Sequence, residues 1–69
     1  MSRDSRREVR AALERLPERD QQILLLHEEG YRYREIALAL KLNLASVGTL
    51  LARARRAFRE AYEELFRAP

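Results

Sequence analysis

Residues 33–51 read YREIALALKLNLASVGTLL, which is an apolar periodic segment, a brief break and a second such segment. The inward-facing residues of the first segment are Ile36, Ala37 and Leu40. Their spacing predicts a short helix from about Tyr33 to Leu40. Asn43 is a favoured helix cap, so a second helix is expected from Leu44 onward. A short helix, a tight turn and a longer helix is the arrangement of a helix-turn-helix, whose second helix enters the major groove of DNA. The same pattern also describes many helical bundles that do not bind DNA.

The segment after Asn43 carries an apolar stripe at helical spacing. Its members are Leu44, Val47, Leu51, Ala54, Phe58, Tyr62 and Leu65. The stripe extends over about six turns of 3.6 residues, which is long for so small a chain. Arg53, Arg56 and Arg59 fall outside the stripe, so we expect them on the solvent side of this helix.

Two further helices are expected before this pair. Ser5 and Glu8 have the spacing of a capping box, which predicts a first helix from Ser5 and a disordered tail over residues 1–4. Pro17 suits the first turn of a second helix. The uninterrupted apolar run Ile23–Leu26 predicts that this second helix is buried on several sides.

Gly30 fits the left-handed residue that ends the second helix. With 69 residues, the chain holds one domain at most. The sequence therefore predicts an all-α, four-helix domain over residues 5–66, a winged-helix-like DNA-binding bundle. The helix-turn-helix is expected at about residues 33–56, and the last helix is long.

The formal net charge of +3 is concentrated in the second half of the chain. Residues 1–30 hold six Arg against seven Asp and Glu, whereas residues 31–69 hold seven Arg and one Lys against four Glu. A basic half that contains a groove-entering helix favours double-stranded DNA as the partner.

The sequence lacks the residues that several classes of function require. There is no Cys and only one His, which excludes disulfides, thiolate chemistry and a credible zinc site. No catalytic triad and no phosphate-binding glycine loop is present, so we expect neither an enzyme nor a cofactor. No apolar run reaches the length of a membrane span. We therefore expect a soluble intracellular protein with no membrane partner and no small-molecule substrate.

The helix-turn-helix interpretation assigns DNA contacts to both of its helices. Arg32 and Arg34 lie where phosphates pass, and Arg53 and Arg56 reach flanking phosphates or a guanine edge. The predicted DNA-binding residues are Arg32, Arg34, Ser46, Gly48, Thr49, Leu50, Arg53 and Arg56.

Five short strings occur in order between residues 16 and 58. They are Leu16-Pro17-Glu18-Arg19, Ile23-Leu24-Leu25-Leu26, Glu29-Gly30, Tyr33-Arg34-Glu35-Ile36-Ala37 and Ala52-Arg53-Ala54-Arg55-Arg56-Ala57-Phe58. Together they resemble the promoter-binding region 4 of extracytoplasmic-function (ECF) sigma factors, in the sigma-70 family.

The resemblance implies a domain that binds the −35 promoter element in duplex DNA and docks on the flap of the RNA polymerase β subunit. Anti-sigma factors often cover the same surfaces. It further implies a bacterial protein of the cytoplasm, associated with the nucleoid. Because the promoter-melting half of such a factor is missing, the chain is interpreted as an excised fragment.

The chain departs from the family pattern at several positions. Arg32 stands where a Ser or Thr is usual, and Lys41 stands where a Gly is usual. In the reading helix, the usual polar residues are replaced by Gly48, Thr49, Leu50 and Ala52. Two interpretations stay open: recognition through apolar contact and DNA shape, with Leu50 or Ala52 on a thymine methyl group, or a face that binds protein. We favour the first because the arginines remain.

The chain has more large apolar residues than a core of this size needs. The candidates for a protein interface are Leu38, Phe58, Tyr62 and Leu65. Phe58, Tyr62 and Leu65 either cover the first helix or form an interface that the isolated domain exposes. Tyr31 and Tyr33 are interpreted as packing around the turn rather than as stacking on DNA. The alternative function is a protein-interaction module for an anti-sigma factor, the polymerase flap or a second copy, with weak base recognition.

Overall fold

The computed structural model describes residues 3–67, with side chains described from residue 5 onward. Four helices follow in order: α1 (Arg3–Leu13), α2 (Glu18–Glu28), α3 (Tyr33–Leu40) and α4 (Leu44–Phe66). No strand occurs between residues 3 and 67, so the predicted all-α class with a long last helix is confirmed. The predicted bounds of the third helix, at Tyr33 and Leu40, are also confirmed.

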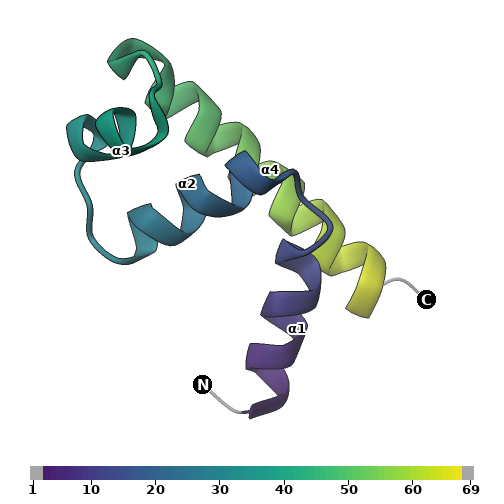
Figure 1. Cartoon of the computed structure of the whole chain (residues 1–69). Helices are drawn as coiled ribbons and strands as arrows, with labels where there is room; N and C mark the ends of the chain where they lie inside the picture. The colour runs from purple at the N-terminus through teal and green to yellow at the C-terminus, as the bar shows by residue number, and fades with distance from the viewer. Residues whose placement is uncertain (1–2, 68–69) are drawn as a thin grey trace.

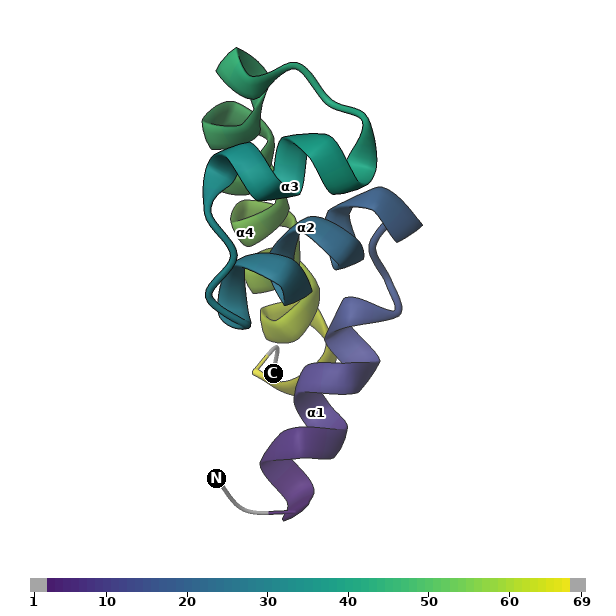
Figure 2. The same ribbon diagram turned by 60° about the vertical axis from the view of Figure 1, so that its left-hand side comes forward.

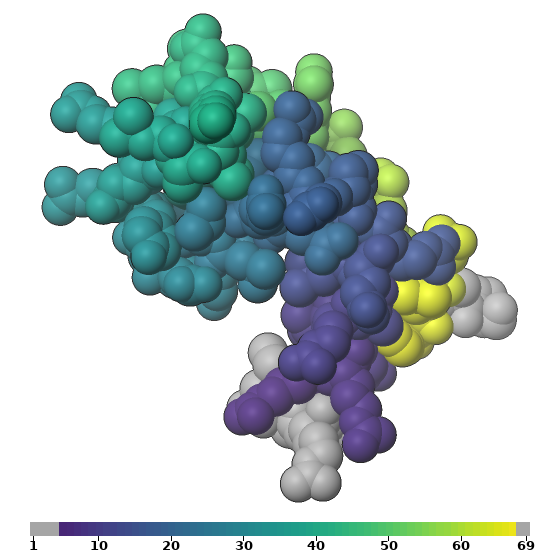
Figure 3. Space-filling model, viewed as in Figure 1, coloured from purple at the N-terminus to yellow at the C-terminus, as the bar shows by residue number. Residues whose placement is uncertain are grey.

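Helix α4 is the axis on which the other three helices pack (Figure 1). Helix α3 lies at the beginning of α4, α2 crosses its middle, and α1 lies against its last turns (Figure 2). The space-filling view shows α3 and the free end of α1 at opposite extremes of an elongated molecule, which measures 39 × 21 × 15 Å (Figure 3).

The first of two apolar clusters joins α2, α3 and α4. Its buried members are Ile23, Ile36, Ala37, Val47 and Leu51. The half-buried leucines packed against them are Leu24, Leu26, Leu40, Leu42 and Leu50. The predicted inward face of α3 is thus confirmed. Leu42, in the connection between α3 and α4, ties that turn to the same cluster.

The second cluster fixes α1 on the last turns of α4. It consists of Ala12, Leu16 and Ala61, with Phe58 and Tyr62 packed against it. Phe58 and Tyr62 therefore cover the first helix, which was one of the two predicted alternatives.

Two polar contacts accompany this second cluster. The Tyr62 hydroxyl donates a hydrogen bond to Oε1 of Glu8 at 3.0 Å, and Arg15 forms an ion pair of 3.1 Å with Glu64. The hydrogen bond to the Glu8 carboxylate raises the pKa of Tyr62, and partial desolvation and the charge of Glu8 act in the same direction. The hydrogen bond joins α1 to α4, and the ion pair joins the connection between α1 and α2 to α4. Both lie at or near the surface.

Three predictions for individual residues were wrong. Helix α1 begins at Arg3, so Ser5 lies inside its first turn and is not the cap. Of the predicted disordered tail, Arg3 and Asp4 belong to α1 instead, and Met1 and Ser2 lie outside the described residues. Leu25 of the apolar run is 47% exposed, so α2 is buried on fewer sides than predicted. In the stripe of α4, Leu44 and Leu65 are exposed, and Ala61 lies in the core instead.

Gly30 ends α2 in the left-handed conformation, with a φ of 95°, as predicted. The Tyr31 N–H donates to the Leu26 carbonyl at 3.1 Å, and the Gly30 N–H donates to the His27 carbonyl at 3.0 Å. These two bonds form a Schellman motif, which satisfies carbonyl groups that the end of a helix leaves without partners.

The turn between α3 and α4 repeats this geometry with a lysine. Lys41 has φ 56° and ψ 48°, and the Leu42 N–H donates to the Ala37 carbonyl at 2.8 Å. The predicted cap of α4 is confirmed, since the Asn43 side chain accepts a 3.0 Å hydrogen bond from the Ala45 N–H. The two helices meet at 93°, within the range of helix-turn-helix pairs.

We expect Lys41→Gly to raise the free energy of unfolding by about 0.5–1 kcal/mol. The left-handed conformation costs a residue with a Cβ roughly 1–2 kcal/mol, and the extra freedom of glycine in the unfolded chain offsets part of that gain. Urea denaturation at equilibrium measures the change. A variant no more stable than the parent would contradict the prediction.

The matched control is Gly30→Ala at the equivalent position after α2. An added Cβ meets no heavy atom within 4 Å there, so only the positive φ opposes the substitution. The free energy of unfolding should fall by about 1 kcal/mol.

Candidate nucleic-acid interface

The first half of α4 has one face in the core and the opposite face in solvent. Val47, Leu51 and Ala54 are buried. At steps of four, three and four residues, the exposed positions Ala45, Thr49, Ala52 and Arg56 form a line on the other side. This line is the outward face of the helix, and it lies next to the turn from α3.

The predicted DNA-binding residues of α4 divide into two groups by exposure. Thr49, Arg53 and Arg56 are exposed, whereas Ser46, Gly48 and Leu50 are half-buried. The Leu50 side chain packs against the first core cluster, so only part of it faces solvent. The structure thus presents Thr49 and the two arginines most openly.

Gly48 lies beneath the aromatic ring of Tyr33. A Cβ built on Gly48 would lie 3.6 Å from Cε2 of Tyr33, which is an ordinary van der Waals distance. Tyr33 is 43% exposed as a residue, and its ring centre lies 6.2 Å from that of His27. Packing around the turn, which the sequence predicted for Tyr33, therefore leaves much of its ring exposed to solvent.

Arg32 and Arg34 lie where α3 begins, and both are exposed. With Tyr33, Glu35 and Leu44 they line an open hollow of about 560 Å³ between the first turns of α3 and α4. The Arg32 N–H donates to Oε1 of Glu35 at 2.8 Å. A guanidinium has no acceptor atom, so Arg32 cannot complete the capping box as Ser or Thr would, and its charge stays available to solvent.

Arg56 on the outward face and exposed Arg53 beside it have no acidic partner among the described side chains. Within residues 5–67 the ion pair that the structure shows is Arg15–Glu64, at the other end of α4. Arg53 and Arg56 therefore present uncompensated positive charge to solvent. Such charge, beside a helix that projects from the core, suits the phosphates that flank a DNA groove.

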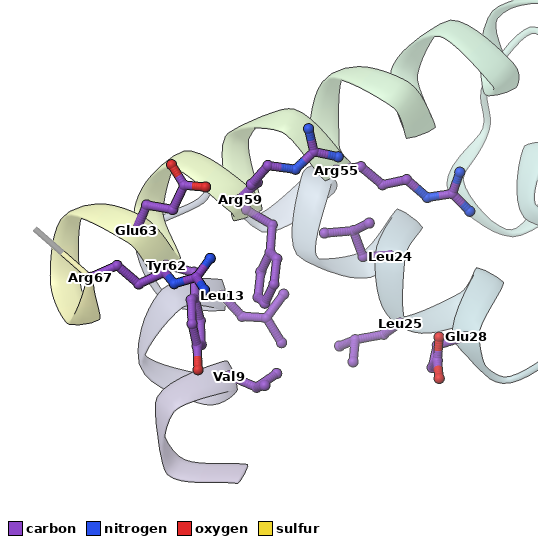
Figure 4. A pocket seen from close by; sticks show the side chains of 11 residues that line it. Val9, Leu13, Leu24, Leu25, Glu28, Arg55, Arg59, Tyr62, Glu63 and Arg67 are labelled. Atoms are coloured by element: carbon purple, nitrogen blue, oxygen red, sulfur yellow. The ribbon is translucent and has the colours of Figure 1, made fainter. Parts of the chain in front are cut away.

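A second surface lies between α1, α2 and the last half of α4, where the structure forms an apolar groove of about 540 Å³ (Figure 4). Its apolar lining is Val9, Leu13, Leu24, Leu25, Phe58 and Tyr62. Its charged rim is Glu28, Arg55, Arg59, Glu63 and Arg67. Of the predicted interface residues, Phe58 and Tyr62 line this groove, whereas Leu38 and Leu65 do not.

Leu38 and Leu65 are separated by the length of the molecule. Leu38 lies on α3 and is 76% exposed, which confirms the predicted exposure of its side chain. Leu65 lies in the last turn of α4 and is also exposed. The four interface candidates therefore do not form one surface.

Comparison with protein families gives a match to the model of sigma-70, region 4, over residues 6–58. The chain belongs to the sigma-70 region 4 family. Region 4 domains are non-enzymatic DNA-binding domains, which bind the −35 promoter element and interact with RNA polymerase. The comparison with curated proteins gives no match, and neither does the comparison with solved structures.

Neither a metal-ligating cluster nor a single membrane-spanning helix occurs in the described part of this region 4 domain. No group of three or more His, Cys, Asp or Glu side chains in the described part of the chain is placed to hold a metal ion. Within residues 3–67 no single helix is long and apolar enough to cross a membrane. Taken together, α3 and α4 have the length and composition of a membrane span. They are bent by 93° at the turn between them, and this bent pair is the helix-turn-helix.

Two exposed residues of this region 4 domain lie at the interface but were not predicted there: Ala45, on the outward face beside Thr49, and Tyr33, against Gly48. Ala52, a predicted contact for a thymine methyl group, lies on the same face. The signal for Ala45 was its spacing of four residues from Thr49, which places both on one side of a helix. The position of Tyr33 had no local signal, because it depends on how α3 crosses α4.

We expect Gly48→Ala to raise the free energy of unfolding by about 0.5–1 kcal/mol, which is the cost of glycine inside a helix. The added methyl group meets only the Tyr33 ring at a normal contact distance, so no clash offsets the gain. Thermal and urea denaturation test this prediction. Lower stability would show that the ring cannot adjust and that glycine is required for packing.

Proposed function

We propose that this chain is the −35-reading domain of an ECF-type sigma factor and that α4 is its groove-entering helix. The observation that carries the proposal is the outward face of α4. Arg53 and Arg56 are exposed and unpaired there, and Val47 and Leu51 hold the opposite face in the core. The ECF assignment rests on the strings between residues 16 and 58, and it places the protein in the bacterial cytoplasm with its polymerase.

The proposed DNA contacts divide by side-chain chemistry. Arg32 and Arg34 contact phosphates at the beginning of α3, and Arg53 and Arg56 contact phosphates or a guanine edge along α4. Ser46, Gly48, Thr49 and Leu50 lie on the turns of α4 nearest to the bases. Half-buried Leu50 supports the core beneath this face more than it contacts DNA.

We further propose that the apolar groove is the polymerase-binding surface. It opens between α1, α2 and α4, and Leu25 leaves 47% of its surface exposed there. A groove of this kind suits the apolar side of a helix, such as one from the β flap or from an anti-sigma factor. In this arrangement, polymerase and promoter DNA occupy different halves of α4 at the same time.

The double substitution Arg53→Ala and Arg56→Ala tests the DNA-binding surface. We expect affinity for promoter duplex to fall and the slope of log K against log salt to decrease in magnitude by about two, one for each phosphate that the variant no longer neutralises. Fluorescence anisotropy at several salt concentrations measures both quantities.

Arg6→Ala with Arg7→Ala is the matched control, because it removes two exposed arginines from the far end of the molecule. This control should bind DNA as the parent does. Equal binding by both double variants would favour the alternative, a protein-interaction module with weak base recognition.

The substitution Leu25→Asp tests the groove. A carboxylate among apolar side chains should abolish binding to core RNA polymerase while leaving DNA binding intact, because Leu25 is half-exposed and lies away from α3. The control is Leu38→Asp, at an exposed leucine outside the groove. Retained polymerase binding by Leu25→Asp would contradict the groove as the docking site. Loss of binding in Leu38→Asp alone would move the docking site to α3.

A further inference from the structure

The edges of the apolar groove carry more arginine than glutamate. Along the α4 edge lie three arginines and one glutamate, which are Arg55, Arg59, Glu63 and Arg67 (Figure 4). The α2 edge holds Glu28. All of these side chains are exposed. The α4 edge therefore has a net positive charge, and the α2 edge has a negative one.

The α1 edge of the groove is basic as well. Val9 and Leu13 line the groove from α1. Arg6 and Arg10 lie three residues before them, so helical geometry puts both arginines on the adjoining strip of this helix, and both are exposed. A helix that lies in the groove is thus bordered by arginine from α1 as well as from α4.

The arginines around the groove are not neutralised within the domain. In the described range 5–67 the ion pair is Arg15–Glu64, and no arginine at the groove takes part in it. Arg55 donates to Nδ1 of His27 at 3.3 Å, since a guanidinium can only donate. That bond directs the Arg55 side chain toward α2 and leaves its charge without an acidic partner. The positive charge around the groove is therefore available to a second molecule.

We infer that the helix which binds in this groove is acidic on both sides of its apolar stripe. The inference rests on the proposed function, which brings a helix to the groove, and it adds the charge that this helix carries. Its apolar side chains cover Leu25 and Phe58, and its Asp or Glu side chains face the arginines of α1 and α4. A basic side chain is expected opposite Glu28, because complementary charges fix the orientation of a bound partner.

Two synthetic helical peptides test this charge. They share one length and one apolar stripe of leucines, and they differ only in the residues beside the stripe, which are Glu in one peptide and Lys in the other. Fluorescence anisotropy measures the affinity of each for the 69-residue chain. We expect the acidic peptide to bind about tenfold more tightly at low salt, which three surface ion pairs of ordinary strength supply. Added salt should reduce the difference, because it screens such pairs.

A charge reversal on the α4 edge assigns the preference to the groove. The double variant Arg55→Glu with Arg59→Glu should lose the preference for the acidic peptide. Because Arg55 also bonds to His27, the single variant Arg59→Glu is measured beside it and should show a smaller loss. The matched control, Arg7→Glu with Arg19→Glu, changes the net charge equally at exposed positions outside the groove and should behave as the parent does. Circular dichroism checks that each variant is folded.

Each outcome decides between the charge inference and the groove proposal. Equal affinity of the parent for both peptides would overturn the charge inference and leave the groove proposal intact. A preference that persists in the charge-reversed variants, or displacement of the acidic peptide by promoter duplex, would place the peptide on another surface and overturn the inference. Absence of binding by both peptides, or binding that Leu25→Asp leaves unchanged, would overturn the groove proposal itself. A preference in the parent and the control, together with its loss in the charge-reversed double variant, would support both.

Discussion

The burial of Ile23, Ile36, Val47 and Leu51 in one apolar cluster sets the arrangement of the last three helices. These side chains come from three helices, so their common burial fixes α3 across α4 at 93°. Removing this apolar surface from water is the main favourable contribution to the fold. Since Val47 and Leu51 fix the rotation of α4 about its axis, helical geometry determines which residues face outward.

The sharp turn between α3 and α4 is compatible with that cluster only because its backbone polar groups are satisfied locally. The Leu42 N–H bonds to the last turn of α3, and the Asn43 side chain caps α4. Lys41 carries the left-handed conformation that such a turn requires. Leu42 then returns to the core, so the local geometry and the packing support the same arrangement.

The length of α4 separates two surfaces of different chemistry. At 1.5 Å per residue its 23 residues extend roughly 35 Å, enough for an outward face over its first half that ends at exposed arginines and an apolar groove along its last half. Helix α1 contributes one wall of the groove and is held there by Ala12, Leu16 and the Tyr62–Glu8 hydrogen bond. One helix thus presents a face suited to polyanion and, farther along, an apolar face suited to protein.

Neighbouring residues were enough to predict the helical class, the bounds of α3, the left-handed end at Gly30 and the Asn43 cap. Helix periodicity and capping act over a few residues, so the local pattern carries them. The packing of the helices was needed to show that Leu25 faces a groove, that Leu50 packs on the core, and that Ala61 takes the place of Leu65 in the core. It also decided that Tyr33 covers Gly48. These positions depend on which distant helix lies against each side chain, and residues far apart in the chain make those contacts.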